Sequence, residues 1–217
     1  MNIEQARFNM IEQQIRPWDV LDPGVLSLLA VVKREDFVPP AYKALAFVDT
    51  QVPLPGGQSM LEPKVEARLL QELAVHKHES VLEVGAGSGY MAALLGHKAR
   101  QVVTMEINAE LAAFARANLE RAGAMNVSVR HADGSRGLAD EGPFDVILLS
   151  GSVADVPPQL LAQLKVGGRL AAIVGQLPIM RATLVTRSSD HDFASVELFD
   201  TVAPRLSGFD EPTRFTF

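Results

Sequence analysis

From residue 63 onward, the hydrophobic positions alternate between two spacings. Apolar residues at helical spacing predict helices near residues 64–75, 90–97, 109–122 and 157–164. Short apolar runs between them predict strands at residues 80–84, 101–106, 127–131, 144–150 and 169–174. Strands and helices that alternate in this way form a mostly parallel sheet with helices on both faces. The pattern therefore predicts an α/β fold of the Rossmann-like, doubly wound type.

The two ends of the chain depart from this alternation. Residues 181–187 and 194–203 predict two strands with no helix between them, so we expect them to pair antiparallel. Two helices, at residues 4–16 and 24–33, are predicted to precede the core. Residues 37–63 are rich in proline and glycine and lack a clear period. Irregular segments of this length are often functional.

Composition and charge exclude several kinds of site and partner. A chain of 217 residues can bury the core of one α/β domain. It contains no cysteine, which rules out disulfides, thiolate metal sites and a cysteine nucleophile. The five histidines have no metal-ligand spacing, so no metal is expected. A net charge of −6 with scattered Lys and Arg argues against a nucleic-acid partner.

The N-terminus carries no basic-then-apolar signal. No apolar run approaches the roughly 20 residues needed to cross a bilayer. We therefore expect a cytoplasmic protein without a membrane partner.

Three alternating glycines follow the first predicted strand of the core, in the sequence VLEVGAGSGY at residues 81–90. Glycine permits positive φ and lets a ligand approach the backbone closely. The spacing is G-x-G-x-G, whereas a dinucleotide pyrophosphate is expected on G-x-G-x-x-G. Glu83, just before the turn, suits a ligand with a positive charge. S-adenosylmethionine (SAM) fits, since its methionine part carries an ammonium and a sulfonium.

The next two strands also end near acidic residues. Glu106 follows Glu83 by 23 residues, and a mononucleotide fold places its ribose-binding acid about 20 residues after the glycine turn. A carboxylate there can accept hydrogen bonds from both ribose hydroxyls. Asp133 and Gly134 end the following strand, where Asp133 could accept a hydrogen bond from the adenine amino group.

Several further segments match one known family in order and spacing. They are MIEQQIR (10–16), REDFVP (34–39), AFVD (46–49), VPLPGGQ (52–58), GPFDVI (142–147), PPQLL (157–161) and LKVGGRL (164–170). With the glycine turn, they make the chain resemble the class I methyltransferases, and among these the protein-L-isoaspartate O-methyltransferases, over about residues 8 to 175.

The resemblance implies SAM-dependent carboxyl methylation of isoaspartyl residues in damaged proteins or peptides, which starts their repair. It also implies the class I methyltransferase fold, with its antiparallel C-terminal strand pair. We expect a single domain over 1–217, with a helical extension and substrate loop at 1–63 and a SAM-binding core at 64–217. A carboxylate acceptor is ionised at neutral pH and needs no general base, so no catalytic triad is required.

The chain departs from the family at two places. The family's substrate loop reads G-Q-T-I-S-x-P, whereas residues 57–63 read GQSMLEP. Ser59 keeps a hydroxyl, but Leu61 stands where the family's active-site serine is expected, so the catalytic residue is unknown. Gln58, Ser150 and Ser152 are candidate replacement donors. The family's C-terminal F-V-P-L segment has only a partial match within residues 197–206.

The predicted cofactor-binding residues are Ser59, Glu83, Gly85, Ala86, Gly87, Ser88, Gly89, Glu106, Asp133 and Gly134. Two other functions stay open. One is a related methyltransferase with another acceptor, and the other is a SAM-binding or nucleotide-binding sensor without turnover. An NAD-dependent oxidoreductase is disfavoured by the glycine spacing.

Overall fold

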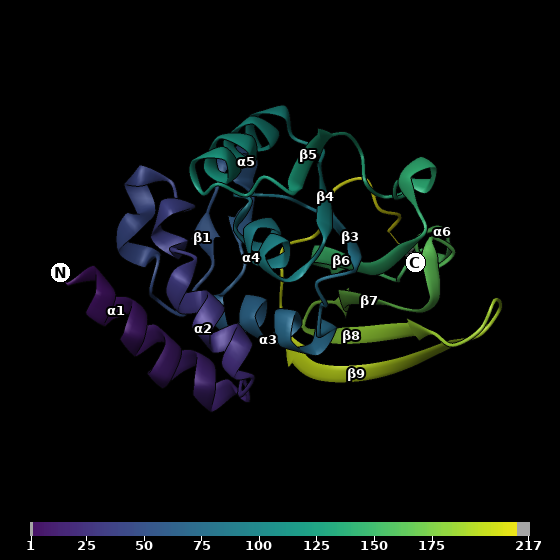
Figure 1. Ribbon diagram of the computed structural model, residues 1–217, viewed down its shortest axis with the longest axis horizontal. Coiled ribbons are helices and arrows are strands. Elements are labelled where there is room, and N and C mark those ends of the chain that lie inside the picture. The colour runs from purple at the N-terminus through teal and green to yellow at the C-terminus, as the bar shows by residue number, and fades with distance from the viewer. Residues whose placement is uncertain (1, 212–217) are drawn as a thin grey trace, which may run out of the picture.

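The computed structural model describes residues 2–211. Its main sheet has seven strands in the order β5-β4-β3-β6-β7-β8-β9 (Figure 1). The strands are β3 (Ser80–Val84), β4 (Gln101–Glu106), β5 (Val127–His131), β6 (Phe144–Val153), β7 (Leu164–Gln176), β8 (Ile179–Arg187) and β9 (Phe193–Thr201). The first five are parallel, whereas β8 pairs antiparallel with both β7 and β9. The predicted fold class and antiparallel C-terminal pair are confirmed.

The strand order reverses beside β3, which lies between β4 and β6. The chain runs outward from β3 through β4 to β5 and then crosses back to β6. In open α/β sheets, ligands bind outside the carboxyl ends of the strands at such a switch point. The topology therefore predicts a ligand-binding site at the carboxyl ends of β3, β4 and β6.

The helices cover the two faces of the sheet unequally. α3 (Pro63–Leu73), α4 (Tyr90–Lys98) and α5 (Ala109–Arg121) pack on the face to which Val81 and Val102 contribute. Alternate residues such as Leu82 and Val103 point to the other face. That face carries the single-turn helix α6 (Pro158–Leu161) together with loops and the segment 202–209.

The helix predicted at 157–164 is therefore too long, and β7 begins before the predicted residue 169. Leu164 already pairs with Phe144 and is fully buried. The adjacent Gly167 and Gly168 interrupt the apolar pattern, which hides the early start of the strand from the sequence.

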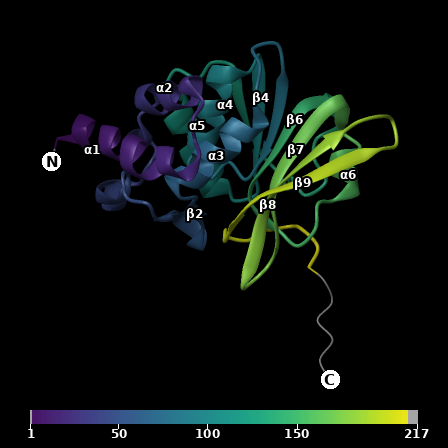
Figure 2. The ribbon, with the colours of Figure 1, turned by 90° about the horizontal axis from the view of Figure 1, so that it is seen from below.

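Two buried ion pairs connect the N-terminal helical region internally and to this core. α1 (Ile3–Met10), continued by a π-helical turn to Ile15, contributes Arg7, which pairs with Glu35. Arg34 follows α2 (Pro23–Val31) and pairs with Glu66 on α3. Figure 2 shows α1 and α2 at the opposite side of the molecule from β8 and β9.

The proline-rich segment before α3 contains little regular structure. Short 3-10 helices at Pro40–Leu45 and Pro55–Gly57 flank and interrupt a small hairpin of β1 (Val52–Pro53) and β2 (Ser59–Met60). The hairpin brings residues 54–61 to the carboxyl edge of the sheet, where they line a cavity.

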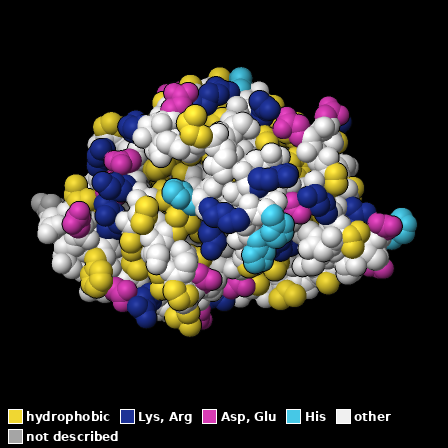
Figure 3. Space-filling model, viewed as in Figure 1, with side chains coloured by type: hydrophobic (Ala, Val, Ile, Leu, Met, Phe, Trp, Pro, Cys, Tyr) yellow, Lys and Arg dark blue, Asp and Glu magenta, His cyan; other side chains and the backbone are white. Residues whose placement is uncertain are grey.

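Acidic and basic side chains are interspersed on the face in Figure 3. No helix within residues 2–211 is long and apolar enough to cross a membrane.

Candidate functional site

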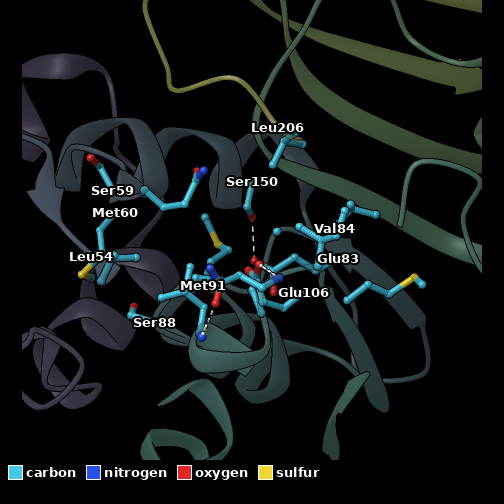
Figure 4. Close-up of a pocket in the computed structure, with 18 of the residues that line it drawn as sticks. Leu54, Ser59, Met60, Glu83, Val84, Ser88, Met91, Glu106, Ser150 and Leu206 are labelled. Atoms are coloured by element: carbon cyan, nitrogen blue, oxygen red, sulfur yellow. Dashed lines mark hydrogen bonds between the residues drawn. The ribbon is translucent and has the colours of Figure 1, made fainter. Parts of the chain in front are cut away.

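A cavity of about 310 Å³ lies at the carboxyl ends of β3, β4 and β6. Its wall combines the glycine turn, the junction of β4 and α5, the hairpin segment and the C-terminal segment (Figure 4). Within the described chain, its only charged side chains are Glu66, Glu83 and Glu106, and no Lys or Arg lines it. The cavity therefore suits a ligand with positive charge.

The glycine turn approaches the hairpin closely. Gly87 has a φ of +52°, and a Cβ atom there would lie 3.3 Å from Leu54 Cδ1. A side chain at Gly87 would thus fill the space between the turn and the hairpin. Gly89, in contrast, lies outside the cavity wall and precedes α4, where a Cβ would lie 3.2 Å from the Ala115 carbonyl oxygen on α5. Gly89 permits close helix packing.

Glu106 joins the glycine turn to the start of α5. Its Oε2 accepts a hydrogen bond from the Gly87 N–H and its Oε1 accepts one from the Asn108 N–H, both at 2.9 Å. The side chain is buried in the cavity wall. Each carboxylate oxygen has a further lone pair, so the group can still accept hydrogen bonds from two vicinal hydroxyls.

Glu83 lies beneath the turn and is fully buried. The hydroxyls of Thr104 and Ser150 each donate a hydrogen bond to one of its oxygens at 2.6 Å (Figure 4 shows Ser150 directed at Glu83). Burial raises the pKa of Glu83 to about 7, although both hydroxyls act in the opposite direction. The geometry makes Glu83 a fixed, internally bonded acid in the floor of the cavity.

A third carboxylate, Glu66, was not predicted from the sequence. It lies on α3, is 4% exposed and lines the same cavity. Burial raises the pKa of Glu66 to about 7, partly offset by its ion pair with Arg34. Its position on α3 is a signal that the sequence does contain. Leu69 and Leu70, three and four residues later, share its helix face and are core leucines. A charged residue on an apolar helix face can mark a site.

The hairpin segment contains Ser59 and Leu61, at the two hydroxyl positions of the expected substrate loop. Ser59 is half-buried and lines the cavity, as does the side chain of Leu61, which is 5% exposed. The Leu61 carbonyl accepts a hydrogen bond from Arg34 Nη2 at 2.9 Å. The serine position of the family therefore presents an apolar surface here.

The three candidate donors differ in availability. Ser150 lines the cavity, but its hydroxyl is bonded to Glu83. Ser152 is not part of the wall, and its hydroxyl donates to the Ala203 carbonyl at 2.9 Å. Gln58 lines the cavity, and within residues 2–211 its side chain makes no hydrogen bond. Gln58 is the donor most available to a ligand.

The last predicted pair divides between the wall and the surface. Gly134 lines the cavity, and a Cβ there would lie 2.5 Å from Val84 Cγ1. Asp133 is exposed, lies outside the wall and accepts a hydrogen bond from the Ser135 N–H at 2.8 Å. Its contact with adenine stays a prediction.

The C-terminal segment closes the cavity opposite the hairpin. The Ser152 N–H donates to the Pro204 carbonyl at 2.7 Å, and the Leu206 N–H donates to the Ser152 carbonyl at 2.9 Å. Leu206 and Ser207 consequently line the cavity. Figure 4 shows Leu206 across the cavity from Ser59.

Comparison with known proteins gives a consistent result. Residues 5–202 match the model of the family described as protein-L-isoaspartate(D-aspartate) O-methyltransferase (PCMT). A protein-L-isoaspartate O-methyltransferase from Koribacter versatilis is 46% identical over 181 residues, covering 83% of this chain and 81% of that protein. One from Rhodopseudomonas palustris is 40% identical over 192 residues, 88% of each chain.

The fold also has solved counterparts. A Plasmodium falciparum beta-aspartate methyltransferase (PCMT), in complex with S-adenosyl-L-homocysteine, superposes with a TM-score of 0.77. The match covers 95% of this chain and 99% of that chain at 20% identity.

Proposed function

The chain belongs to the protein-L-isoaspartate(D-aspartate) O-methyltransferase family, and we propose that the cavity at the carboxyl ends of β3, β4 and β6 is its reaction site. The protein is a SAM-dependent carboxyl O-methyltransferase. The observation that carries the assignment of the cavity is its charge. Three carboxylates and no cation line it within the described residues, which suits a cationic methyl donor and opposes a dinucleotide pyrophosphate.

We propose that Glu106 binds the ribose of SAM. Its two oxygens are held by the Gly87 and Asn108 N–H groups, which fix the carboxylate without using all of its lone pairs. Gly85, Ala86 and Ser88 line the path of the cofactor beside Gly87.

The remaining predicted cofactor residues have more limited roles in this proposal. Ser59 faces the cavity from the hairpin. Asp133, next to the wall residue Gly134, is the proposed partner of the adenine amino group. Gly89 acts through helix packing.

When bound, SAM would supply a methyl group activated by its sulfonium, with a neutral thioether as the leaving group. The protein then has to orient the acceptor carboxylate in line and to exclude water. The hairpin and the C-terminal segment enclose the cavity from two sides, which serves both purposes. No residue has to accept a proton, because a carboxylate acceptor is already ionised at neutral pH.

We propose the free carboxylate of an isoaspartyl residue in a peptide or protein as the acceptor. The side chain of Leu61 cannot donate a hydrogen bond to this carboxylate. Gln58 lies on the same wall with an unused amide, and it is the proposed replacement donor. We also propose a cytoplasmic location, which cell fractionation with an antibody to the protein would test.

Incubation with labelled SAM and matched isoaspartyl and aspartyl peptides tests the function. We expect label in the isoaspartyl peptide only. Transfer to another carboxyl compound but to neither peptide would favour a related methyltransferase. SAM binding without transfer to any acceptor would favour a sensor.

A further inference from the structure

Glu66 lies outside the motifs that predict the cofactor site, yet its carboxylate belongs to the same cavity wall. Its Oε2 accepts a hydrogen bond from Arg34 Nη1. Within residues 2–211, the other oxygen, Oε1, accepts no hydrogen bond, and it is not fully buried. The cavity thus contains a carboxylate oxygen free to accept from a ligand.

Glu66 and Glu106 reach the cavity from different sides. Glu106 ends β4, Glu83 is on the neighbouring β3, and the sheet continues through β6 to β7 and β8. Helix α3, which carries Glu66, packs against β7 and β8. A cofactor whose ribose lies at Glu106 can extend its methionine part past Glu83 toward Glu66, because all three carboxylates line one cavity.

Glu83 is less suited to bind the ammonium of that methionine part. Its side chain is fully buried, unlike those of Glu106 and Glu66, and each of its oxygens already accepts a short hydrogen bond, from Thr104 and from Ser150. Building on the proposed SAM site, we propose that Glu66 accepts a hydrogen bond from the α-ammonium group of SAM, with Arg34 positioning its carboxylate. The sequence motif had pointed to Glu83 for this charge.

The electrostatics of Glu66 support a cationic partner. Burial raises the pKa of Glu66 to about 7 even though Arg34 lies beside it. Arg34 alone therefore does not offset the cost of burying the negative charge of the carboxylate. A bound ammonium supplies a second positive charge and N–H donors, whereas a sulfonium has no donor. Arg34 also donates to the Leu61 carbonyl, which fixes the guanidinium between α3 and the hairpin.

Calorimetry with Glu66→Gln, the demethylated product and one analogue of it tests this assignment. One ligand is S-adenosylhomocysteine, and the other is its desamino analogue, which keeps the carboxylate and lacks only the ammonium. Glu66→Gln should weaken S-adenosylhomocysteine roughly ten- to a hundredfold, the range for a hydrogen bond between charged groups. Binding of the desamino analogue should change by no more than about twofold, or improve. Glu62→Gln is the matched control, because Glu62 is half-buried at the start of α3 and outside the wall.

Equal losses for both ligands, or no loss for either, would overturn the role of Glu66. An altered KM for the peptide with unchanged S-adenosylhomocysteine affinity would also overturn it and assign Glu66 to the acceptor. If wild type bound no SAM, the proposed site itself would fail. Should Glu66→Gln not fold because Arg34 is left unpaired, the double variant Arg34→Met/Glu66→Gln carries the same ligand comparison against Arg34→Met.

Discussion

The two ends of the cavity are built in different ways. The ribose end is local: the glycine turn and Glu106 come from adjacent β-α units, and backbone N–H groups hold the carboxylate directly. The acceptor end is assembled from two distant parts of the chain, namely the hairpin with Leu61 and the C-terminal segment with Leu206. Its positions depend on side-chain contacts such as that of Arg34 with the Leu61 carbonyl.

Because of this difference, the two ends should tolerate side-chain substitutions to different degrees. A ligand that is constant throughout the family can be held by backbone geometry, which side-chain substitutions barely alter. An acceptor end held by side chains can change its chemistry one residue at a time, as the leucine at position 61 illustrates. Substitutions at the ribose end should therefore weaken or abolish SAM binding, whereas those at the acceptor end should shift rates.

The largest effect is expected from Gly87→Val at the ribose end. Gly87 has a φ of +52°, and its Cβ would face Leu54 Cδ1 at 3.3 Å, in the path proposed for SAM. SAM binding should be abolished while circular dichroism stays close to wild type. Gly167→Val is the matched control, since Gly167 also has positive φ (+83°) but no neighbour within 4 Å of its Cβ. Unfolding of Gly87→Val alone would make Gly87 a structural residue.

The same division explains how much the sequence could predict. The glycine turn, Glu106 and the alternation of strands and helices follow from short-range patterns, and the structure reproduces them. Glu66 was missed because the sequence of α3 does not show that Arg34, about 30 residues earlier in the chain, lies beside it. Asp133 is exposed beside the wall, and its contact with adenine stays a prediction. Contacts between distant segments depend on packing that no local period encodes.

Glu106→Ala should have the second largest effect. The ribose hydroxyls would lose a charged acceptor, which costs about 1.5–3 kcal/mol, or roughly ten- to a hundredfold in affinity. Calorimetry with SAM measures the change, and Glu110→Ala, an exposed acid in the first turn of the adjoining α5, is the control. Glu106→Ala should weaken the binding of a 2′-deoxy analogue of SAM less than it weakens the binding of SAM itself. Equal SAM affinity in wild type and Glu106→Ala would remove the ribose assignment.

At the acceptor end, Leu61→Ser should raise isoaspartyl methylation. A restored hydroxyl that bonds the acceptor carboxylate in the transition state is worth roughly ten- to a hundredfold in rate. Methyl transfer from labelled SAM to an isoaspartyl peptide measures it. Leu54→Ser is the control, because Leu54 is a buried leucine of the same wall and lies outside the serine position. If neither wild type nor Leu61→Ser transfers methyl while SAM binds, the acceptor is not isoaspartate.

The smallest effect is expected in the pH dependence of stability, and it concerns Glu83 in the floor of the cavity. Burial raises the pKa of Glu83 from 4.5 to about 7, so the folded protein holds a proton that the unfolded chain has released. The free energy of unfolding should therefore fall as pH rises from about 4.5 to 7 and then level off, by on the order of 1–3 kcal/mol for this group. Glu83→Gln should lose less stability between pH 5 and pH 8 than wild type in urea unfolding, with Glu110→Gln as the exposed control. Glu66 titrates in the same direction, so part of the slope should survive in the variant. Parallel pH profiles for wild type and Glu83→Gln would mean that Glu83 is ionised throughout this range, with the hydroxyls of Thr104 and Ser150 compensating its burial.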